Sequence, residues 1–388
     1  MRKIMALFMV VLLLLCCVNA MSEGTYQAIG AFHEGLAAVQ AADGLWGYID
    51  TTGAVVIPCE WENANDFSFG VARVQKDRLY GYIDASGKTV IPCKWKNGAD
   101  IARDGMLWVS ENSYGEPYQI MNTEGKLLGP GGWEGSLYPR FSEGLAAVYK
   151  DGLFGYIDTT GELVIPCQFK FGNIFSHGYA VAQDDGGLFL IDKTGAPAFP
   201  DLPRAVVADA FREDGICFLE FFDGTSAYIN TDGKTLCSLP EGYKSRSGFS
   251  DGLAGIGTMN ENGDPVEAYM NTSGEIVINN LISTQKRFHN GRVSFADARI
   301  TADVPLHYGV MDTTGAIVYP CELDEEVNFE EIVARAVRDG KEAVMDLNGN
   351  LVIPFEEGCT SIAIGEGIVT ALKNGEISLF DYEGKPLN

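Results

Sequence analysis

The chain has 388 residues, of which 46% are hydrophobic, and its formal net charge at pH 7 is −25. The hydrophobic fraction allows a large buried core and argues against a disordered chain. The acidic charge, with no basic cluster visible along the sequence, argues against binding to nucleic acid, because a phosphate-binding surface needs such a cluster.

The first twenty residues have the layout of a secretory signal peptide. Arg2 and Lys3 precede an apolar run from Ile4 to Val18, and small residues stand before a cut after Ala20. We expect residues 1–20 to be removed, and the remaining chain to be secreted or held in the cell envelope.

Two alternatives to cleavage stay open. The apolar run is shorter than the ~20 residues that span a membrane, but it could act as an uncleaved anchor. Cys16 or Cys17 could carry a lipid, although the residue that precedes each of them does not suit a lipoprotein signal. No second hydrophobic stretch follows, so we expect no membrane span after the signal peptide.

From residue 26 onward one pattern recurs ten times. In a good copy, Gly35–Val39 is followed by Trp46–Asp50, then by a glycine three residues after the Asp, and then by Val55–Pro58. The Asp or Asn recurs at intervals of 34 to 41 residues, each time with that glycine. The clearest turn pairs are Asp50 and Gly53, Asp84 and Gly87, Asp158 and Gly161, Asp192 and Gly195, Asp312 and Gly315, and Asp346 and Gly349; four further copies turn at Asn122, Asn230, Asn271 and Asp381.

The pattern predicts a tight turn between short strands. Asp or Asn starts a turn by accepting backbone hydrogen bonds, and Gly adopts the positive φ that completes it. The β-rich runs around the turn give about three short strands a unit, and the proline should end the last of them. The fold class is therefore all-β: a repeat array of about ten short three-stranded units, propeller-like or a β-solenoid.

The unit Gly-Leu-Ala-x-Val, aromatic-Gly-Tyr-Ile-Asp-x-x-Gly and Val-Ile-Pro resembles the bacterial WG repeat, whose Trp-Gly pair is Trp46-Gly47 here. The resemblance covers residues 26 to 388 and implies a β-repeat array in an exported or envelope protein. It implies no agreed catalytic activity. Residues 21–388 would then be one array, or two sub-arrays dividing near 200–245. The ring could close through Tyr26–Ile29, or the last copy could be a cap.

Seven cysteines follow the signal peptide. Cys59, Cys93, Cys167 and Cys321 all follow the repeat proline, so we interpret them as small apolar residues of the unit. A disulfide between Cys59 and Cys93 is the alternative, if adjacent units bring them into reach.

No catalytic or metal-binding set stands out. The turn residues supply one carboxylate each, too few for calcium, and the four histidines lack metal-ligand spacing. Gly248-Phe-Ser250-Asp-Gly252 matches a nucleophile elbow, but it is the repeat's own Phe-Ser-Asp-Gly with a glycine in front. We therefore expect no enzyme, no metal and no cofactor.

Copies three, seven and eight carry longer loops before their Tyr-Ile strand. Insertions at one position of a repeat project from one face, which is often the binding face. The candidate binding residues in these loops are Tyr114, Glu116, Asn260, Asn262, Asp264, Arg299 and Asp303.

The sequence thus favours an exported, non-enzymatic scaffold that binds a protein or a cell-surface glycan through these loops. The alternative is a carbohydrate-binding or glycan-active protein with an aromatic and acidic groove, which needs repeat aromatics such as Trp61 and Trp95 to be exposed. A third reading is an envelope spacer whose length matters and whose surface does not.

Overall fold

The computed structural model describes residues 25–98, 105–112, 117–134, 140–281, 287–296, 306–329, 331–356 and 359–387. The predicted signal peptide, residues 1–20, lies outside this part of the chain. Within it every regular element is a β-strand, and no helix is long and apolar enough to cross a membrane. The prediction of an all-β repeat array is confirmed.

Ten antiparallel units follow one another, numbered here as units 1 to 10. Unit 1 contains β1 (Tyr26–Ile29), β2 (Leu36–Ala41), β3 (Trp46–Asp50) and β4 (Val55–Trp61), and unit 2 contains β5 (Asn63–Ala64), β6 (Val71–Lys76), β7 (Leu79–Asp84) and β8 (Thr89–Trp95). Unit 3 contains β9 (Asn97–Gly98), β10 (Met106–Ser110), β11 (Tyr118–Asn122) and β12 (Leu127–Trp133). Unit 4 contains β13 (Leu145–Lys150), β14 (Leu153–Asp158) and β15 (Leu163–Phe169), and unit 5 contains β16 (Phe171–Gly172), β17 (Tyr179–Asp184) and β18 (Gly187–Asp192).

Unit 6 contains β19 (Ala205–Ala208), β20 (Ile216–Phe221), β21 (Ser226–Asn230) and β22 (Thr235–Cys237), and unit 7 contains β23 (Lys244–Ser250), β24 (Leu253–Met259), β25 (Pro265–Asn271) and β26 (Ile276–Leu281). Unit 8 contains β27 (Arg292–Ala296), β28 (Tyr308–Asp312) and β29 (Ile317–Leu323), and unit 9 contains β30 (Val333–Arg338), β31 (Lys341–Asp346) and β32 (Leu351–Ile353). Unit 10 contains β33 (Cys359–Gly365), β34 (Ile368–Lys373) and β35 (Glu376–Asp381). The pairing β18–β19 joins units 5 and 6 into one seven-stranded sheet, which crosses the stretch 200–245.

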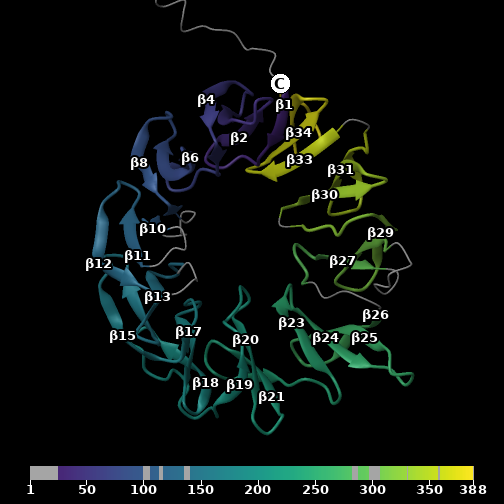
Figure 1. Ribbon diagram of the computed structural model, residues 1–388. Helices are drawn as coiled ribbons and strands as arrows, with labels where there is room; N and C mark the ends of the chain where they lie inside the picture. Colours follow the sequence, from purple (N-terminus) through teal and green to yellow (C-terminus); the bar gives the residue numbers. More distant parts are fainter. Residues whose placement is uncertain are drawn as a thin grey trace, which may run out of the picture.

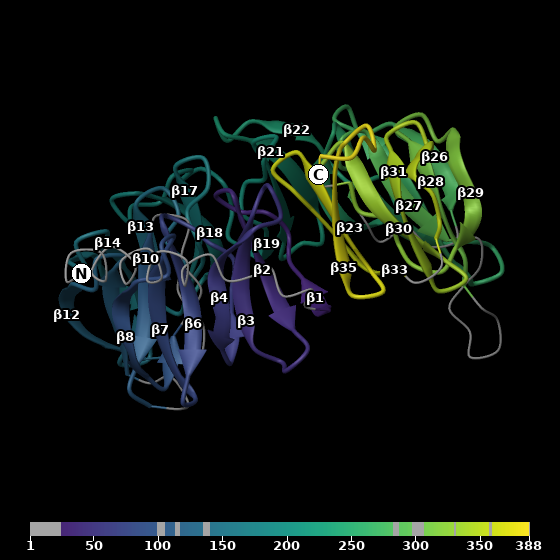
Figure 2. The same cartoon turned by 90° about the horizontal axis from the view of Figure 1, so that it is seen from above.

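The units stand in a ring (Figure 1). Strands such as β20, β23, β27 and β30 lie toward its centre, and β12, β15 and β29 lie at its margin. Figure 2 gives the view from above, in which β3 and β4 stand beside β6 and β7 of the next unit. The arrangement is propeller-like, with each sheet sandwiched between two neighbours.

The sandwiching explains why the repeat's Leu-Ala-x-Val run does not alternate with polar residues. Leu36, Ala37, Ala38 and Val39 of β2 are all buried. Ala38 packs toward unit 2, in a cluster with Val74, whereas Ala37 and Val39 pack toward unit 10. A strand with both faces covered reads as a continuous apolar run.

The ring is closed by contacts between unit 1 and unit 10. The backbone N–H of Tyr26 donates to the carbonyl of Gly375 at 2.9 Å. The Glu366 carboxylate accepts from the backbone N–H groups of Glu34 and Gly35, at 2.6 and 2.9 Å. Between them lies one apolar cluster, to which the two ends contribute Ile29, Phe32, Ala37, Val39, Ile49, Leu372 and Leu379. Closure through the first strand, and not a terminal cap, is therefore what the structure shows.

The Glu366 link repeats inside the ring. Glu34 accepts from the N–H of Gly70 in unit 2, Glu143 from Gly178 in unit 5, and Asp251 from Gly291 in unit 8. Each acceptor stands in a tight two-residue turn and caps the same turn of the next unit. The seam is thus held by the same bond that joins neighbouring units elsewhere.

The Asp/Asn-x-x-Gly turns have the expected bonds. Asp158 Oδ1 accepts from the backbone N–H groups of Thr160 and Glu162 and from the Thr160 hydroxyl. Gly161 has a φ of 84°. These turns also touch the preceding unit: a Cβ on Gly87 would lie 3.3 Å from Ile57. Each turn therefore contributes both a reversal of the chain and a contact between units.

The prediction that the repeat proline ends its strand is wrong. Pro58 lies inside β4, which continues to Trp61, and Pro92, Pro166 and Pro320 lie inside β8, β15 and β29. The register shifts there: Tyr48 pairs with Ile57, but Trp46 pairs with Trp61. A β-bulge on an outer strand accommodates a residue that cannot donate to the ladder.

All seven cysteines of the described chain are free. The alternative of a Cys59–Cys93 disulfide is therefore wrong. Cys59 and Cys93 are half-buried in different inter-unit clusters, and burial raises the pKa of both thiols.

Candidate functional site

Four arginines line a cavity of about 330 Å³ that is formed by residues of units 6 to 9. We call it the arginine pocket. Its lining residues are Arg212, Arg246, Ser247, Arg287, His289, Arg292, Val293, Ser294, Glu326, Val327, Asn328 and Phe329. They come from the turn before β20, from β23, from the start of unit 8 and from the segment before β30.

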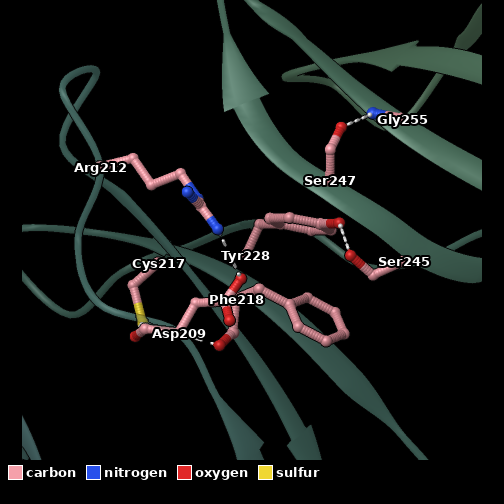
Figure 3. Close-up of polar contacts among 8 residues, drawn as sticks. All are labelled: Asp209, Arg212, Cys217, Phe218, Tyr228, Ser245, Ser247 and Gly255. Atoms are coloured by element: carbon pink, nitrogen blue, oxygen red, sulfur yellow. Dashed lines mark hydrogen bonds and ion pairs between the residues drawn. The ribbon is translucent and has the colours of Figure 1, made fainter. Parts of the chain in front are cut away.

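Arg212 is held by packing on a glycine. A Cβ built on Gly248 would lie 2.2 Å from Arg212 Nε, so the guanidinium group lies directly against the backbone of β23. Nη2 of Arg212 is 3.4 Å from Asp209 Oδ2, a long contact that Figure 3 shows with its surroundings. Arg212 Nε is buried and has no hydrogen-bond partner among the described residues. Only glycine at 248 leaves room for this position of the side chain.

Two buried groups lie beside Arg212. The Cys217 thiol donates to the Asp209 carbonyl at 3.1 Å, and burial raises its pKa to about 12. The Tyr228 hydroxyl donates to Ser245 Oγ at 3.2 Å, and burial raises its pKa to about 12 as well. Figure 3 shows both. They stay protonated at neutral pH and leave the positive charge of Arg212 unchanged.

Arg246 extends from β23 with its guanidinium group against Gly257, where a Cβ would lie 2.5 Å from Nε. The adjacent Ser247 Oγ accepts from the Gly255 N–H at 3.0 Å (Figure 3). The pairing of β23 with β24 shifts register between Ser245 and Phe249. This irregular stretch carries both of unit 7's residues in the pocket.

The guanidinium group of Arg292 donates its hydrogen bonds to backbone carbonyls. It donates to the carbonyl of Gly291 at 2.8 Å and, across the unit boundary, to the carbonyl of Leu347 in unit 9. Buried Ser294 donates to the Gly309 carbonyl at 3.1 Å and accepts from the Val327 N–H at 3.3 Å. These contacts fix the wall between units 8 and 9 and place one positive charge on it.

The pocket is rich in hydrogen-bond donors. Four arginines and one glutamate, Glu326, are among its described lining residues, with Asp209 beside Arg212, in a chain whose formal net charge is −25. Guanidinium groups present paired donors that match carboxylate and phosphate oxygens. The arrangement is suited to holding an anion.

Ser250 of the Gly-x-Ser-x-Gly match is engaged in a structural contact. It ends β23, and its hydroxyl donates to the Phe288 carbonyl of unit 8 at 2.6 Å. Asp251 and Gly252 form the tight turn into β24, both with positive φ. A nucleophile elbow needs a strand-to-helix turn, and this is a strand-to-strand turn.

The predicted loop residues are only partly described. Tyr114, Glu116, Arg299 and Asp303 lie outside the described residues. Asn260, Asn262 and Asp264 form the turn of the β24–β25 hairpin, where Asn260 Oδ1 accepts from the N–H groups of Asn262 and Asp264. Asn262 is exposed, and neighbouring Met259 is 63% exposed.

The repeat aromatics pack between units. Trp61, Trp95 and Phe169, which end the last strands of units 1, 2 and 4, are only 4%, 2% and 6% exposed. Among the described residues no group of three potential metal ligands is found.

Sequence reasoning missed the arginine pocket. Arg212, Arg246 and Arg292 stand about one unit apart in the sequence, and only Lys286, Arg287 and Arg292 lie close together in it. The signal was present only as a comparison between copies, since these arginines have no counterpart in the regular units.

The comparisons with known proteins identify the repeat. The model of the WG containing repeat matches residues 21–45, 46–80, 80–114, 154–187 and 308–341. The four longer matches each begin in the strand that carries the aromatic-Gly pair of a unit, namely β3, β7, β14 and β28, and continue into the next unit. No curated protein matches the chain.

Two solved structures are similar over much of the chain. The crystal structure of the tricorn protease has 11% identity and a TM-score of 0.31, with 94% of this chain and 46% of that chain covered. The crystal structure of BamB from Moraxella catarrhalis has 16% identity and a TM-score of 0.34, with 85% and 91% covered. The chain thus spans less than half the length of the tricorn protease chain. The WG repeat found in the sequence is confirmed by the family model alone: this chain contains WG repeats, which the model recognises at five positions.

Proposed function

We propose that the protein is an exported, non-enzymatic scaffold that binds a partner on the arc of the ring formed by units 6 to 9. The observation that carries the proposal is the convergence of four arginines on one cavity in a strongly acidic chain. Positive charge that gathers against the net charge of the molecule focuses the field locally and attracts anionic groups.

The hairpin of unit 7 belongs to the same arc and supports the proposal. Strands β24 and β25 are seven residues each, and the hairpin ends in exposed Asn262 beside Met259. The inserted loops of copies seven and eight belong to the two units that also supply Arg246, Arg287 and Arg292. The donor-rich pocket and the projecting hairpin together favour binding, and not catalysis, as the role of this arc.

The alternative of an aromatic, acidic sugar groove has less support. Trp61, Trp95 and Phe169 are buried between units, and the arginine pocket is lined mainly by basic and polar side chains. Stacking on sugars requires exposed ring faces.

The test is an in-cell crosslinking pull-down from the producing organism's envelope with three proteins. They are the wild type, Arg246→Gln/Arg287→Gln, and Arg78→Gln/Arg140→Gln, which removes the same charge from exposed arginines of units 2 and 4. A partner captured by the wild type and the control, but lost from the pocket variant, supports the proposal. Equal capture by all three contradicts it. Cell fractionation and the mass of the mature protein test export, with Met21 as the expected first residue.

A further inference from the structure

We infer that the arginine pocket binds an anion with at least two oxyanion groups, carboxylate or phosphate. This inference rests on the proposed function, because it names the chemistry recognised on the same arc. It goes further in assigning separate roles to the four arginines.

Two of the four arginines are held in place by contacts within the protein, and the other two can contact a ligand. Arg292 is bound to two backbone carbonyls, and Arg212 lies against Gly248 with Asp209 nearby. Arg246 and Arg287 are exposed and form no hydrogen bond or ion pair with any described residue. Their paired N–H donors are therefore available to oxygens of a bound anion.

The charge of the site calls for more than one anionic group. Among the described residues, four guanidinium groups stand against two carboxylates, Glu326 in the lining and Asp209 beside Arg212. A monoanion would leave part of the remaining positive charge uncompensated, whereas two oxyanion groups could contact Arg246 and Arg287 separately. A fork of donors binds each such group through two parallel bonds.

The size of the pocket limits the ligand. A volume of about 330 Å³ is at the small end of the range typical of ligand pockets, which begins at about 300 Å³. A short dicarboxylate or tricarboxylate, a pyrophosphate, or the end group of a larger molecule would fill it.

The first experiment is calorimetric titration of the purified protein at low salt with pyrophosphate, tricarballylate and acetate. We expect pyrophosphate or tricarballylate to bind and acetate to bind much more weakly. Arg246→Gln/Arg287→Gln should weaken binding by about tenfold or more, since two charge-assisted contacts are lost. The charge-matched Arg78→Gln/Arg140→Gln control should bind as the wild type does. Unchanged melting temperatures show that both variants are folded.

A second variant tests the geometry without changing the charge. Gly248→Ala places a Cβ where Arg212 Nε now lies, so it should displace that guanidinium group and weaken binding, while every arginine is retained. Failure of both polyanions to bind at millimolar concentration would overturn the inference. Equal affinity in the pocket variant and its control would do so too.

Competition separates the two sources of the oxyanion groups. If saturating pyrophosphate releases a partner captured in the pull-down, the groups belong to that partner. If pyrophosphate binds and the partner remains, the ligand of the pocket is a free small molecule. In that second case the inference stands even though the proposed partner site is elsewhere.

Discussion

The glycine of the aromatic-Gly pair is required by a close backbone contact. A Cβ on Gly47, Gly81 or Gly155 would lie 2.5 to 2.6 Å from the carbonyl oxygen of the isoleucine before the repeat proline. The proline bulge of the fourth strand therefore presses against the third strand at this residue. The Trp-Gly signature records a packing constraint within the unit.

Gly155→Ala should therefore destabilise the ring by ~1–3 kcal/mol, the usual cost of forcing an extra methyl group into a packed site. Urea unfolding followed by circular dichroism measures it. Gly186→Ala is the control, because Gly186 is exposed and a Cβ there would be nearest to atoms of the Asp184 and Arg204 side chains, none closer than 3.2 Å. A loss at Gly155 no larger than at Gly186 would contradict the packing argument.

The tryptophans that end the fourth strands of units 1, 2 and 3 carry buried donors. The indole N–H groups of Trp61, Trp95 and Trp133 are buried without an acceptor among the described residues. A buried donor without a partner costs ~1–3 kcal/mol. In unit 4 the same position is Phe169, which has no such donor.

Trp95→Phe should leave the free energy of unfolding unchanged or raise it, because lost ring contacts are offset by removal of the unpaired donor. Trp95→Ala should lower it by ~3–5 kcal/mol, the usual cost of removing a large buried ring. Thermal and urea unfolding of the pair decide this. If Trp95→Phe is as damaging as the alanine variant, the indole N–H has a partner, such as a buried water.

At the scale of the strands and turns, the sequence predicted the hairpins well and missed two features. The Asp-x-x-Gly turn can be recognised in the sequence because its hydrogen bonds lie within four or five consecutive residues. The short first strands, such as Asn63–Ala64 and Phe171–Gly172, carry no motif, because only pairing with the second strand defines them. The prolines were misread because a bulge depends on the outer position of the strand.

The turn aspartate can be tested through its protonation. Hydrogen bonds from the Thr160 side chain, and then from backbone N–H groups, hold the pKa of Asp158 below its ordinary value. A lowered pKa contributes stability that is present above the unfolded-state value and is lost as pH falls through the folded-state value. Asn retains the acceptor, as in the copies that turn at Asn122 and Asn230.

Asp158→Ala should lower stability at pH 7 by ~1 kcal/mol, because several backbone bonds lose their acceptor, and Asp158→Asn should lower it less. The gap between wild type and Asp158→Asn should shrink below about pH 4, where the unfolded aspartate is protonated. Urea midpoints from pH 7 to pH 3 measure it. A gap independent of pH would show that the charge does not contribute.

At the scale of the whole molecule, closure of the ring depends on noncovalent contacts at one place. Units 4 and 5 are joined by the Glu143–Gly178 bond and also by the chain itself. Units 1 and 10 have the matching Glu366 bonds, the Tyr26–Gly375 bond and a shared apolar cluster, but no chain connection.

Glu366→Ala should therefore raise amide hydrogen exchange in β1, β34 and β35, while Glu143→Ala, which removes the equivalent link inside the ring, should have a smaller and more local effect. Local opening is governed by the contacts that hold a segment, and at the seam no chain connection adds to the noncovalent contacts. Mass-spectrometric exchange by segment gives the comparison. Equal effects at both places would mean that the Glu366 bonds contribute little to closure.

The arginine pocket also belongs to this scale, which is why sequence reasoning did not find it. Each of its walls comes from a different unit, and only the curvature of the ring brings Arg212, Arg246 and Arg287 around one cavity. Repeat analysis directs attention to what the copies share. The pocket is formed by residues in which units 6 to 9 differ from the others.

The closure of the ring has a consequence for chain connectivity. The C-terminal strands lie beside β1 (Figure 1), and three boundaries inside the ring repeat the carboxylate bond of the seam. A circular permutant, with a short linker joining residues 387 and 25 and new ends opened at the exposed Asp151–Gly152 turn, should therefore fold to the same ring. Such a chain would begin close to Phe154, where a family repeat also begins. The contacts between units determine the shape, and the position of the termini decides only which boundary lacks a peptide bond.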